Sequence, residues 1–369
     1  MRKGICFLVV ILLGGVLTGC QFKDIDKRSF VLAIGVDRPE DPRKRDQFEV
    51  TLKMAIPEGD PTKRTQEAVV ITEVAESVPE AIRLIKSKID KEPDFSHCKA
   101  LIYGESFARD NIVPMTDWSA RRRDIQLIMY VAVGKPSAKE VVNMQTKSER
   151  LPGNALILSL GTEGTESPFI TTVYSFDLHR RITENGMDPL MPVVEAKKPD
   201  MLVIDKVALF DKKKMVAMLS PQETRILNLL RTRNLRSSFH VETAGNKIDY
   251  NLESSRPKYR ICTGKNGKAV IEYSLTGKAM LESNEEGMVI GGPEMRAISK
   301  VAGKQWEEES MKLLKKVQSI GVDPFGWGLR YISRHWNNDT ELKQWQQLYP
   351  EAEFQVKADV KIKYTGMIQ

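Results

Sequence analysis

Two stretches of the chain alternate strictly between apolar and polar residues, and both predict β-strands. Apolar side chains occupy every second position from 48 to 56 and again from 354 to 364. Because successive side chains of a strand point to opposite faces, this period of two indicates a sheet with one buried face. An apolar run at 30–37 comes before the first stretch, and only a polar turn separates the two. We therefore expect those two strands to pair antiparallel. The final strand is expected in a half-buried antiparallel sheet.

Helices are predicted where apolar residues recur every three to four positions behind a capping residue. Ser77 and Glu80 have the spacing of a capping box, and apolar residues follow at helical spacing. Ser137 and Glu140 repeat that spacing. The longest periodic segment, 294–319, predicts one long helix. Strands and helices therefore interleave along the chain, which indicates an α+β body with antiparallel sheets and packed helices.

Composition divides the chain into parts. Prolines and glycines interrupt the periodicity repeatedly between 151 and 200, which indicates either a small loop-rich domain or a connector. Apolar residues at 169–176 favour strands there, and hence the small domain. We therefore expect a multi-domain body: an N-terminal α+β domain at 20–150, the loop-rich part at 151–200, and a C-terminal α+β domain at 201–369.

The first residues carry the most specific signal in the chain. Arg2 and Lys3 precede an apolar run at 5–16, which is too short for a bilayer because spanning takes about 20 apolar residues. A positive head, a short apolar core and small residues describe an export signal. The signal ends in Leu17-Thr18-Gly19-Cys20, the pattern of a bacterial lipoprotein. Residues 1–19 are therefore predicted to be a cleaved lipoprotein signal peptide, and Cys20 to become an S-diacylglycerol, N-acyl cysteine. An ordinary signal peptide, or a core helix with a chance cysteine, is the alternative.

A lipidated Cys20 would tether the whole mature chain. Stable anchoring takes about two acyl chains, which one diacylglyceryl cysteine supplies. No other segment of the sequence reaches bilayer length without charges, so we expect the body to be lipid-anchored on the outer face of the cell membrane. Removing Arg2 and Lys3 lowers the formal net charge from +7 to +5. That mild basic excess suits a surface near anionic lipid or cell-wall polymer.

Two further cysteines, Cys98 and Cys262, remain in the mature chain. One disulfide between them is possible in an exported protein, but two cysteines so far apart are no disulfide framework. Two separate, mostly buried thiols are favoured.

The sequence offers little enzymatic chemistry. Its four histidines do not stand at metal-ligand spacing from one another or from a cysteine pair. Phosphate-binding loops and nucleophile elbows are missing too. Basic clusters are short and scattered, whereas a nucleic-acid surface would collect them with aromatic residues. We therefore predict no catalytic residue, no metal, no cofactor and no nucleic-acid partner, and favour an anchored binding or assembly module over an enzyme.

Several short segments of the C-terminal half are specific when they are read together. Ala208-Leu209-Phe210, a lysine turn, and then Leu219 to Glu223-Thr224 look like the opening of the C-terminal domain in the Ger(x)C family of spore germination lipoproteins. The run 321–328 is similar to the family's Asp-x-Phe-Gly segment. Gln21-Phe22 departs from the Trp-Asp that the family has after its lipidated cysteine. Further matches lie at Asp24-Ile25, Gly35-Val36-Asp37, the helix near Ala81, 97–105, 187–194, Trp336 and Trp345.

The resemblance spans almost the whole mature chain and implies the C subunit of a nutrient germinant receptor. Its partners would be integral-membrane A and B subunits in the inner membrane of the spore. The implied fold is a three-domain α+β body without a known enzymatic activity. The main alternative is an extracytoplasmic solute-binding lipoprotein of a transporter, which would need two similar lobes around a ligand cleft. A lipid-anchored cell-wall hydrolase is weaker, because the sequence shows neither an acid pair nor a metal constellation.

Overall fold

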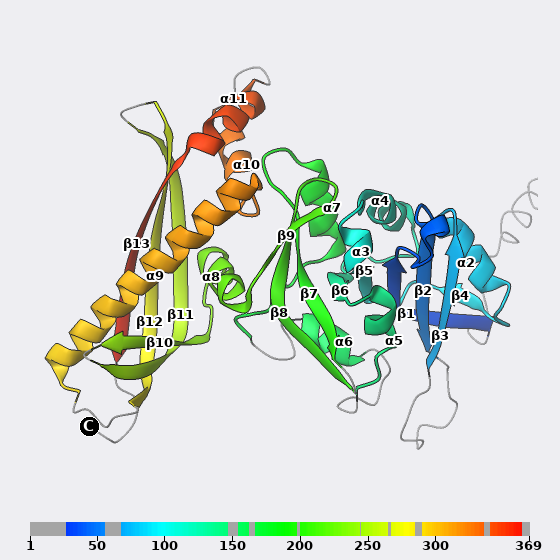
Figure 1. Cartoon of the computed structure of the whole chain (residues 1–369), viewed down its shortest axis with the longest axis horizontal. Coiled ribbons are helices and arrows are strands. Elements are labelled where there is room, and N and C mark those ends of the chain that lie inside the picture. Colours follow the sequence, from blue (N-terminus) through cyan, green and yellow to red (C-terminus); the bar gives the residue numbers. More distant parts are fainter. Residues whose placement is uncertain are drawn as a thin grey trace, which may run out of the picture.

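The computed structural model describes residues 27–55, 68–146, 154–161, 167–197, 200–243, 245–264, 267–284, 290–335 and 340–363. The predicted signal peptide at 1–19 and the predicted lipidation site Cys20 lie outside the described residues. The described part is elongated, with one β-sheet in each half and helices packed on both (Figure 1).

The larger sheet occupies the N-terminal half and has a parallel centre with antiparallel flanks. In spatial order its strands are β3 (Ala68–Ala75), β2 (Phe48–Ala55), β1 (Arg28–Asp37), β5 (Ala100–Gly104), β6 (Tyr130–Lys135), β7 (Leu190–Lys197), β8 (Met201–Phe210) and β9 (Met215–Leu219). A short strand, β4 (Glu92–Asp94), pairs with the start of β1. β1, β5, β6 and β7 run parallel. The predicted antiparallel pairing of β1 and β2 is confirmed.

Helices cover both faces of this sheet. Buried side chains from α2 (Val78–Lys86), α3 (Glu105–Ala108), α4 (Val113–Arg121) and α7 (Ser175–Thr183) share one apolar cluster with the strands. Those of α5 (Ala138–Asn143) and α6 (Asn154–Leu160) share the cluster on the other face. Both predicted caps are present, since Ser77 Oγ accepts from the N–H of Glu80 and Ser137 Oγ from that of Glu140. The helix predicted from periodicity therefore begins where its polar cap stands.

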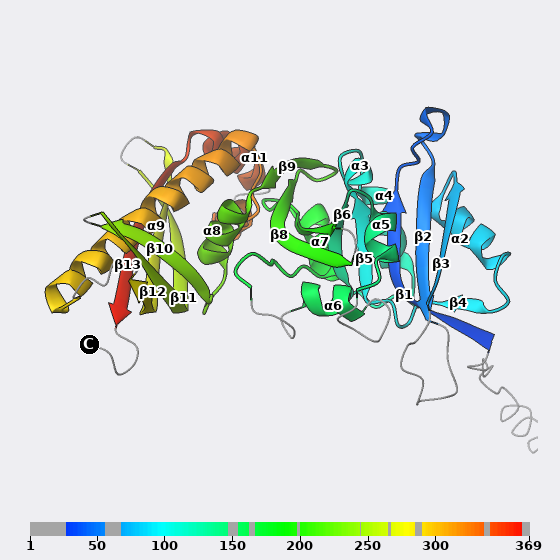
Figure 2. The same ribbon diagram turned by 60° about the horizontal axis from the view of Figure 1, so that its bottom comes forward.

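The C-terminal half is a four-stranded sheet crossed by one long helix (Figure 2). Its strands lie in the order β10 (Ser237–Thr243), β11 (Asn246–Thr263), β12 (Ala269–Asn284) and β13 (Glu353–Lys363). The predicted long helix is confirmed as α9 (Gly292–Ile320), which ends at Gly321 in the left-handed conformation. Shorter helices complete the chain: η2 (Pro42–Lys44), α8 (Pro221–Arg231), α10 (Trp327–Ile332), α11 (Glu341–Leu348) and η3 (Tyr349–Glu351).

The final strand differs from the sequence expectation in its direction. β13 alternates in exposure as predicted, but it pairs parallel to β12. The expected antiparallel pairing was wrong because the chain passes through α9, α10 and α11 between the end of β12 and the start of β13. Such a helical crossover returns the chain to the end of the sheet where β12 began, and a parallel neighbour is the result.

The middle part of the chain also differs from expectation. The predicted strand at 169–176 is reduced to one antiparallel bridge between Tyr174 and Tyr130, and α7 begins at the next residue. Within 151–200, β7 joins the larger sheet by pairing with β6, and β8 continues that sheet beyond it. That sheet therefore extends to Leu219.

One hydrophobic cluster runs through both halves of the molecule. α8 lies between the two sheets (Figure 1) and contributes buried Ile226, Leu227 and Leu230. Trp306 of α9 and Trp327 of α10 are fully buried in the C-terminal half. The predicted mixed body of sheets and packed helices is confirmed, with parallel pairs in both sheets. Among the described helices, none combines the length and the apolar character needed to cross a membrane.

Candidate functional site

The described residues contain no group of histidine, cysteine, aspartate and glutamate side chains that is arranged to hold a metal ion. Cys98 is buried and Cys262 half-buried, and both are free thiols, which confirms the predicted separate cysteines. Burial raises the pKa of Cys98 to about 12. A thiol with so high a pKa stays protonated at neutral pH and is a poor nucleophile.

A cluster of buried polar groups joins the two halves of the molecule around Asp188 and Asp323. Asp323 follows α9 and is buried. Its carboxylate accepts from the N–H groups of Phe325, Gly326 and Gly328 at 3.1, 2.7 and 2.8 Å. Asp188 precedes β7, and its carboxylate accepts from the N–H of Asp323 at 2.7 Å. The N–H of Asp188 donates to the carbonyl of Asp323 in return, at 2.7 Å. We call this cluster the Asp188–Asp323 junction.

Two cations complete the Asp188–Asp323 junction. Lys212, from the turn between β8 and β9, donates to the carbonyls of Arg181, Glu184 and Met187. The buried Arg181 of α7 donates to Asp177 at 2.8 Å and to the carbonyl of Pro324 at 3.0 Å. Side chains of the N-terminal half thus bind backbone atoms of the loop between α9 and α10. These charge-assisted hydrogen bonds fix the position of that loop.

Electrostatics at the junction follow from burial. Burial raises the pKa of Asp323 to about 7, and this effect outweighs the backbone donors that lower it. Burial also raises the pKa of Asp188 and lowers that of Lys212. Perturbed carboxyl groups can mark a catalytic site. Here three backbone N–H groups donate to the Asp323 carboxylate. The cluster therefore serves to hold the fold together.

Close backbone contact reinforces the same junction. Gly186 has φ of +78° and its carbonyl accepts from the N–H of Leu329 at 2.7 Å. A Cβ at Gly186 would lie 2.4 Å from that nitrogen and 2.5 Å from the carbonyl carbon of Gly328. In the same segment, the indole N–H of Trp327 donates to the hydroxyl of Tyr273 at 2.8 Å. Only glycine fits position 186, because any side chain would push the two halves apart.

Segments that carry the family resemblance meet in pairs in the structure. The 187–194 and 321–328 segments meet at the Asp188–Asp323 junction. Asp37 lies near the 97–105 segment and accepts from the N–H groups of Ala138 and Lys139, both at 2.8 Å. A Cβ at Gly104 would lie 1.7 Å from a carboxylate oxygen of Asp37. The residues of these motifs therefore bind helix ends and loops to the larger sheet. A search of the sequence for catalytic patterns does not reveal this structural role.

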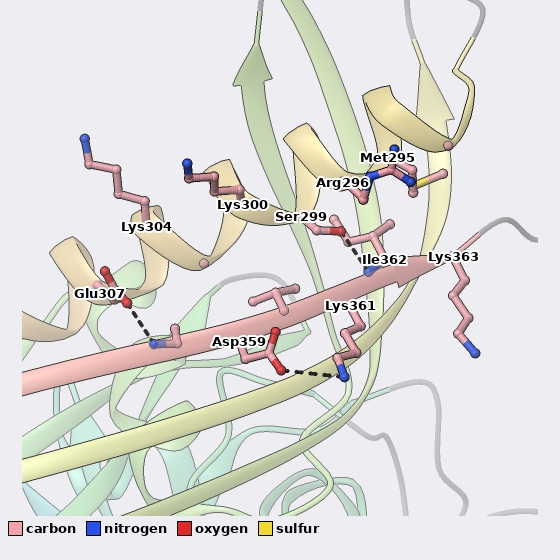
Figure 3. A pocket seen from close by; sticks show the side chains of 14 residues that line it. Met295, Arg296, Ser299, Lys300, Lys304, Glu307, Asp359, Lys361, Ile362 and Lys363 are labelled. Carbon is pink, nitrogen blue, oxygen red and sulfur yellow. Dashed lines mark hydrogen bonds and ion pairs between the residues drawn. The ribbon is translucent and has the colours of Figure 1, made fainter.

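A groove of about 910 Å³ lies between the first half of α9 and the edge strand β13 (Figure 3). Gly303 lines the groove, and a Cβ there would lie 3.0 Å from the carbonyl oxygen of Ala358. Lys300 and Lys304 extend from α9 on the side away from β13, and Lys361 and Lys363 extend from β13, where Lys361 pairs with Asp359 at 3.8 Å (Figure 3). The groove is therefore basic along its rim.

Two α9 side chains occupy the outward edge of β13 in this groove. Glu307 accepts from the N–H of Ala358 at 2.9 Å, and Ser299 Oγ accepts from the N–H of Ile362 at 3.2 Å (Figure 3). The basic rim can attract an acidic segment. An added strand, however, would have to displace both of these side chains. The sequence showed the alternating lysines of β13 but not the helix beside them.

Comparison with family models covers most of the chain. The model described as the spore germination protein N-terminal domain matches residues 21–196. The model described as the C-terminal domain of spore germination B3/GerAC-like proteins matches residues 205–366.

Curated relatives extend over the full length. The putative spore germination protein YfkR of Bacillus subtilis is 22% identical and covers 100% of this chain and 98% of its own. The spore germination protein GerQC of Bacillus cereus is 20% identical and covers 100% of both. The spore germination protein KC of Bacillus subtilis is 20% identical and covers 98% of this chain and 96% of its own.

A solved structure shares the fold. The crystal structure of the GerBC protein aligns with a TM-score of 0.57 at 18% identity, and covers 92% of this chain and 99% of that one. The order of the motifs, the two matched domains and this common fold agree with one another. The chain therefore belongs to the Ger(x)C family of spore germination proteins.

Proposed function

We propose that this protein is the lipid-anchored C subunit of a nutrient germinant receptor. In this role Cys20 holds it on the outer face of the spore inner membrane, and it assembles there with integral-membrane A and B subunits. The observation that carries the proposal is the family match, which extends through both domains and to spore germination proteins of the same length. The role is one of assembly, and no catalysis is assigned to it.

The proposed anchor is supported by the sequence around Cys20. The tetrapeptide Leu17-Thr18-Gly19-Cys20 stands directly before residue 21, where the match to the N-terminal domain begins. A mature chain that starts at Cys20 would therefore keep the whole matched domain. Two acyl chains on that residue are enough for stable membrane attachment.

The buried polar groups support an assembly role. Asp323 and Asp188 bind backbone N–H groups, and Arg181 binds carbonyls and Asp177. Groups that are satisfied in this way hold two halves of a molecule in one arrangement. A receptor subunit that contacts its partners needs such a fixed shape, since rigid surfaces bind with a smaller entropy cost.

The experiment that tests the proposal compares spores carrying Cys20→Ala with spores carrying Cys6→Ala. Both substitutions remove a cysteine from the same N-terminal region, but only Cys20 stands at the predicted lipidation position. We expect Cys20→Ala to abolish the optical-density response to one nutrient and Cys6→Ala to leave it intact. Exogenous calcium dipicolinate should still germinate both, because it bypasses the receptor.

Two outcomes would contradict the proposal. One is an unchanged nutrient response of Cys20→Ala in spores that carry no second receptor for the same nutrient. The other is that the A and B subunits do not co-purify with this protein when it is isolated from spore membranes. Tight binding of free amino acids or sugars to the isolated chain, measured by calorimetry, would point to a solute-binding lipoprotein.

A further inference from the structure

Three large apolar side chains are exposed together on the N-terminal half. The exposed fractions of Leu127, Ile128 and Phe176 are 39%, 59% and 47%. They are neighbours, because the N–H of Phe176 donates to the carbonyl of Leu127 at 3.0 Å. We call these three residues the apolar tip. Single exposed apolar residues are ordinary, whereas a group of them indicates a contact surface.

The apolar tip is held in place by the backbone around it. The N–H of Ser175 donates to the carbonyl of Met129 at 2.9 Å, and the N–H of Val131 to that of Val173 at 3.0 Å. The Phe176 ring stacks on Tyr174 with 5.7 Å between centroids, and Tyr174 stacks on Tyr130 at 5.2 Å. These backbone hydrogen bonds and the column of stacked aromatic rings therefore hold the tip in place.

The apolar tip lies at the edge of the larger sheet where the chain enters it. Ala33 of β1, Ala100 of β5 and Tyr130 of β6 stand in register, and the three strands run parallel. The residues before Tyr130 therefore lie at the amino ends of these strands. Arg28 also borders a surface pocket that Asp124 borders, and Asp124 stands three residues before Leu127. The first described residues, at 27–28, and the apolar tip thus share one edge.

Chain length sets how far this edge can be from the proposed anchor. Seven residues lead from Cys20 to Lys27, the first described residue, and a fully extended segment of that length spans roughly 25 Å. A membrane that holds the lipid of Cys20 is therefore close to the sheet edge. Exposed Arg121 and Arg123 precede the tip, together with exposed Asp124, and Arg121 pairs with Asp117 at 3.8 Å. The arginines favour anionic headgroups.

We propose that the apolar tip inserts into the headgroup region of an anionic phospholipid membrane. This inference rests on the proposed anchoring at Cys20. The lipid fixes one point of the body, and the tip supplies a second, so that the amino ends of the parallel strands face the bilayer. Aromatic and aliphatic side chains flanked by arginines suit the membrane–water interface.

The test measures how deeply position 128 enters the membrane. A Cys262→Ser background leaves Cys98 as the other described cysteine, and it is fully buried. Ile128→Cys is labelled with a bimane dye in the full chain, lipidated at Cys20 and reconstituted into phosphatidylglycerol–phosphatidylethanolamine vesicles. Quenching by brominated lipid is then recorded. We expect at least about twofold stronger quenching than for a dye in water beside the membrane.

Met201→Cys is the matched control. Its side chain is 58% exposed, close to the 59% of Ile128. It stands at the start of β8 and pairs with Lys197 at the carboxyl end of β7, so it lies at the opposite sheet edge. We expect little quenching there. Equal quenching at the two positions would overturn the proposal. So would protection of position 128 only when the A and B subunits are present, since the tip would then contact protein.

The same sample separates this inference from the proposed function. Mass spectrometry shows whether Cys20 carries its lipid. If it carries none, the proposed anchoring fails, and quenching at position 128 with excess vesicles still decides whether the tip binds lipid. If the lipid is present and position 128 is unquenched, the anchoring stands and the proposed insertion is wrong.

Discussion

At the scale of single residues, Asp323 shows how a buried carboxyl group can serve the fold. Three backbone N–H groups bind it and Asp188 lies beside it. Burial raises its pKa from 3.8 to about 7. In the unfolded chain the same group titrates near its ordinary value. Folding therefore takes up a proton between these two pH values.

The first residue-scale consequence is a pH dependence of stability. Between pH 3.8 and about 7, the folded chain holds a proton that the unfolded chain has lost, so the free energy of unfolding falls as pH rises. The slope is at most about 1.4 kcal/mol per pH unit for one proton. We expect Asp323→Asn to make the decline from pH 5 to pH 7 shallower, as measured by urea unfolding. Asp46→Asn, at an exposed aspartate, should keep the wild-type slope. If the two variants have equal slopes, Asp323 does not titrate in this range.

At the scale of secondary-structure elements, β13 shows how an edge strand is protected. Edge strands with free N–H groups invite pairing with other chains. Here α9 lies against the edge, and its side chains Ser299 and Glu307 accept from two outward N–H groups. Lysines alternate on the exposed face of β13. The helix and the charges together keep the edge closed to non-specific partners.

Removing one of these acceptors should weaken the edge measurably. Glu307→Ala leaves the N–H of Ala358 without its partner in a half-buried place, so we expect a loss of about 1–3 kcal/mol in the free energy of unfolding. Glu307→Gln keeps an acceptor and should retain most of the stability. Urea unfolding with light scattering on the folded samples provides the measurement. Equal losses for both variants would show that charge, and not the hydrogen bond, matters at this position.

Local patterns predicted most of these elements. The caps at Ser77 and Ser137, the long helix and the alternation of β13 depend on residues close together in sequence. The predicted antiparallel direction of β13 was wrong, because the alternation of apolar and polar residues is the same in parallel and antiparallel strands. The predicted strand at 169–176 was reduced to a bridge for a related reason. Apolar side chains there pack on the sheet without needing a ladder of their own.

At the scale of the whole molecule, the two sheets are joined as one body. The hydrophobic core continues through α8, and the Asp188–Asp323 junction links backbone to backbone. Gly186 is the tightest point of that contact. The relative position of the two halves in the proposed receptor subunit depends on this junction.

The junction can be tested with two glycines of similar backbone conformation. Gly186 has φ of +78° and Gly245 of +82°, but a Cβ meets backbone atoms of the other half only at Gly186. We expect Gly245→Ala to cost about 1 kcal/mol, the strain of the left-handed conformation alone. Gly186→Ala should cost clearly more, about 3 kcal/mol or above, because it adds a clash. Denaturant unfolding measures both. Equal costs would mean that the junction yields without a penalty.

The sequence by itself determined the family, the predicted lipoprotein signal, the α+β class and the position of the capped helices. These properties reside in short segments, where apolar period and capping chemistry act over a few residues. Tertiary structure decided the direction of β13, the meeting of the 187–194 and 321–328 segments, and the place of the apolar tip at the sheet edge where the described residues begin. Those features depend on residues far apart in sequence. Their positions follow from the crossovers and from burial of shared faces, which no local pattern encodes.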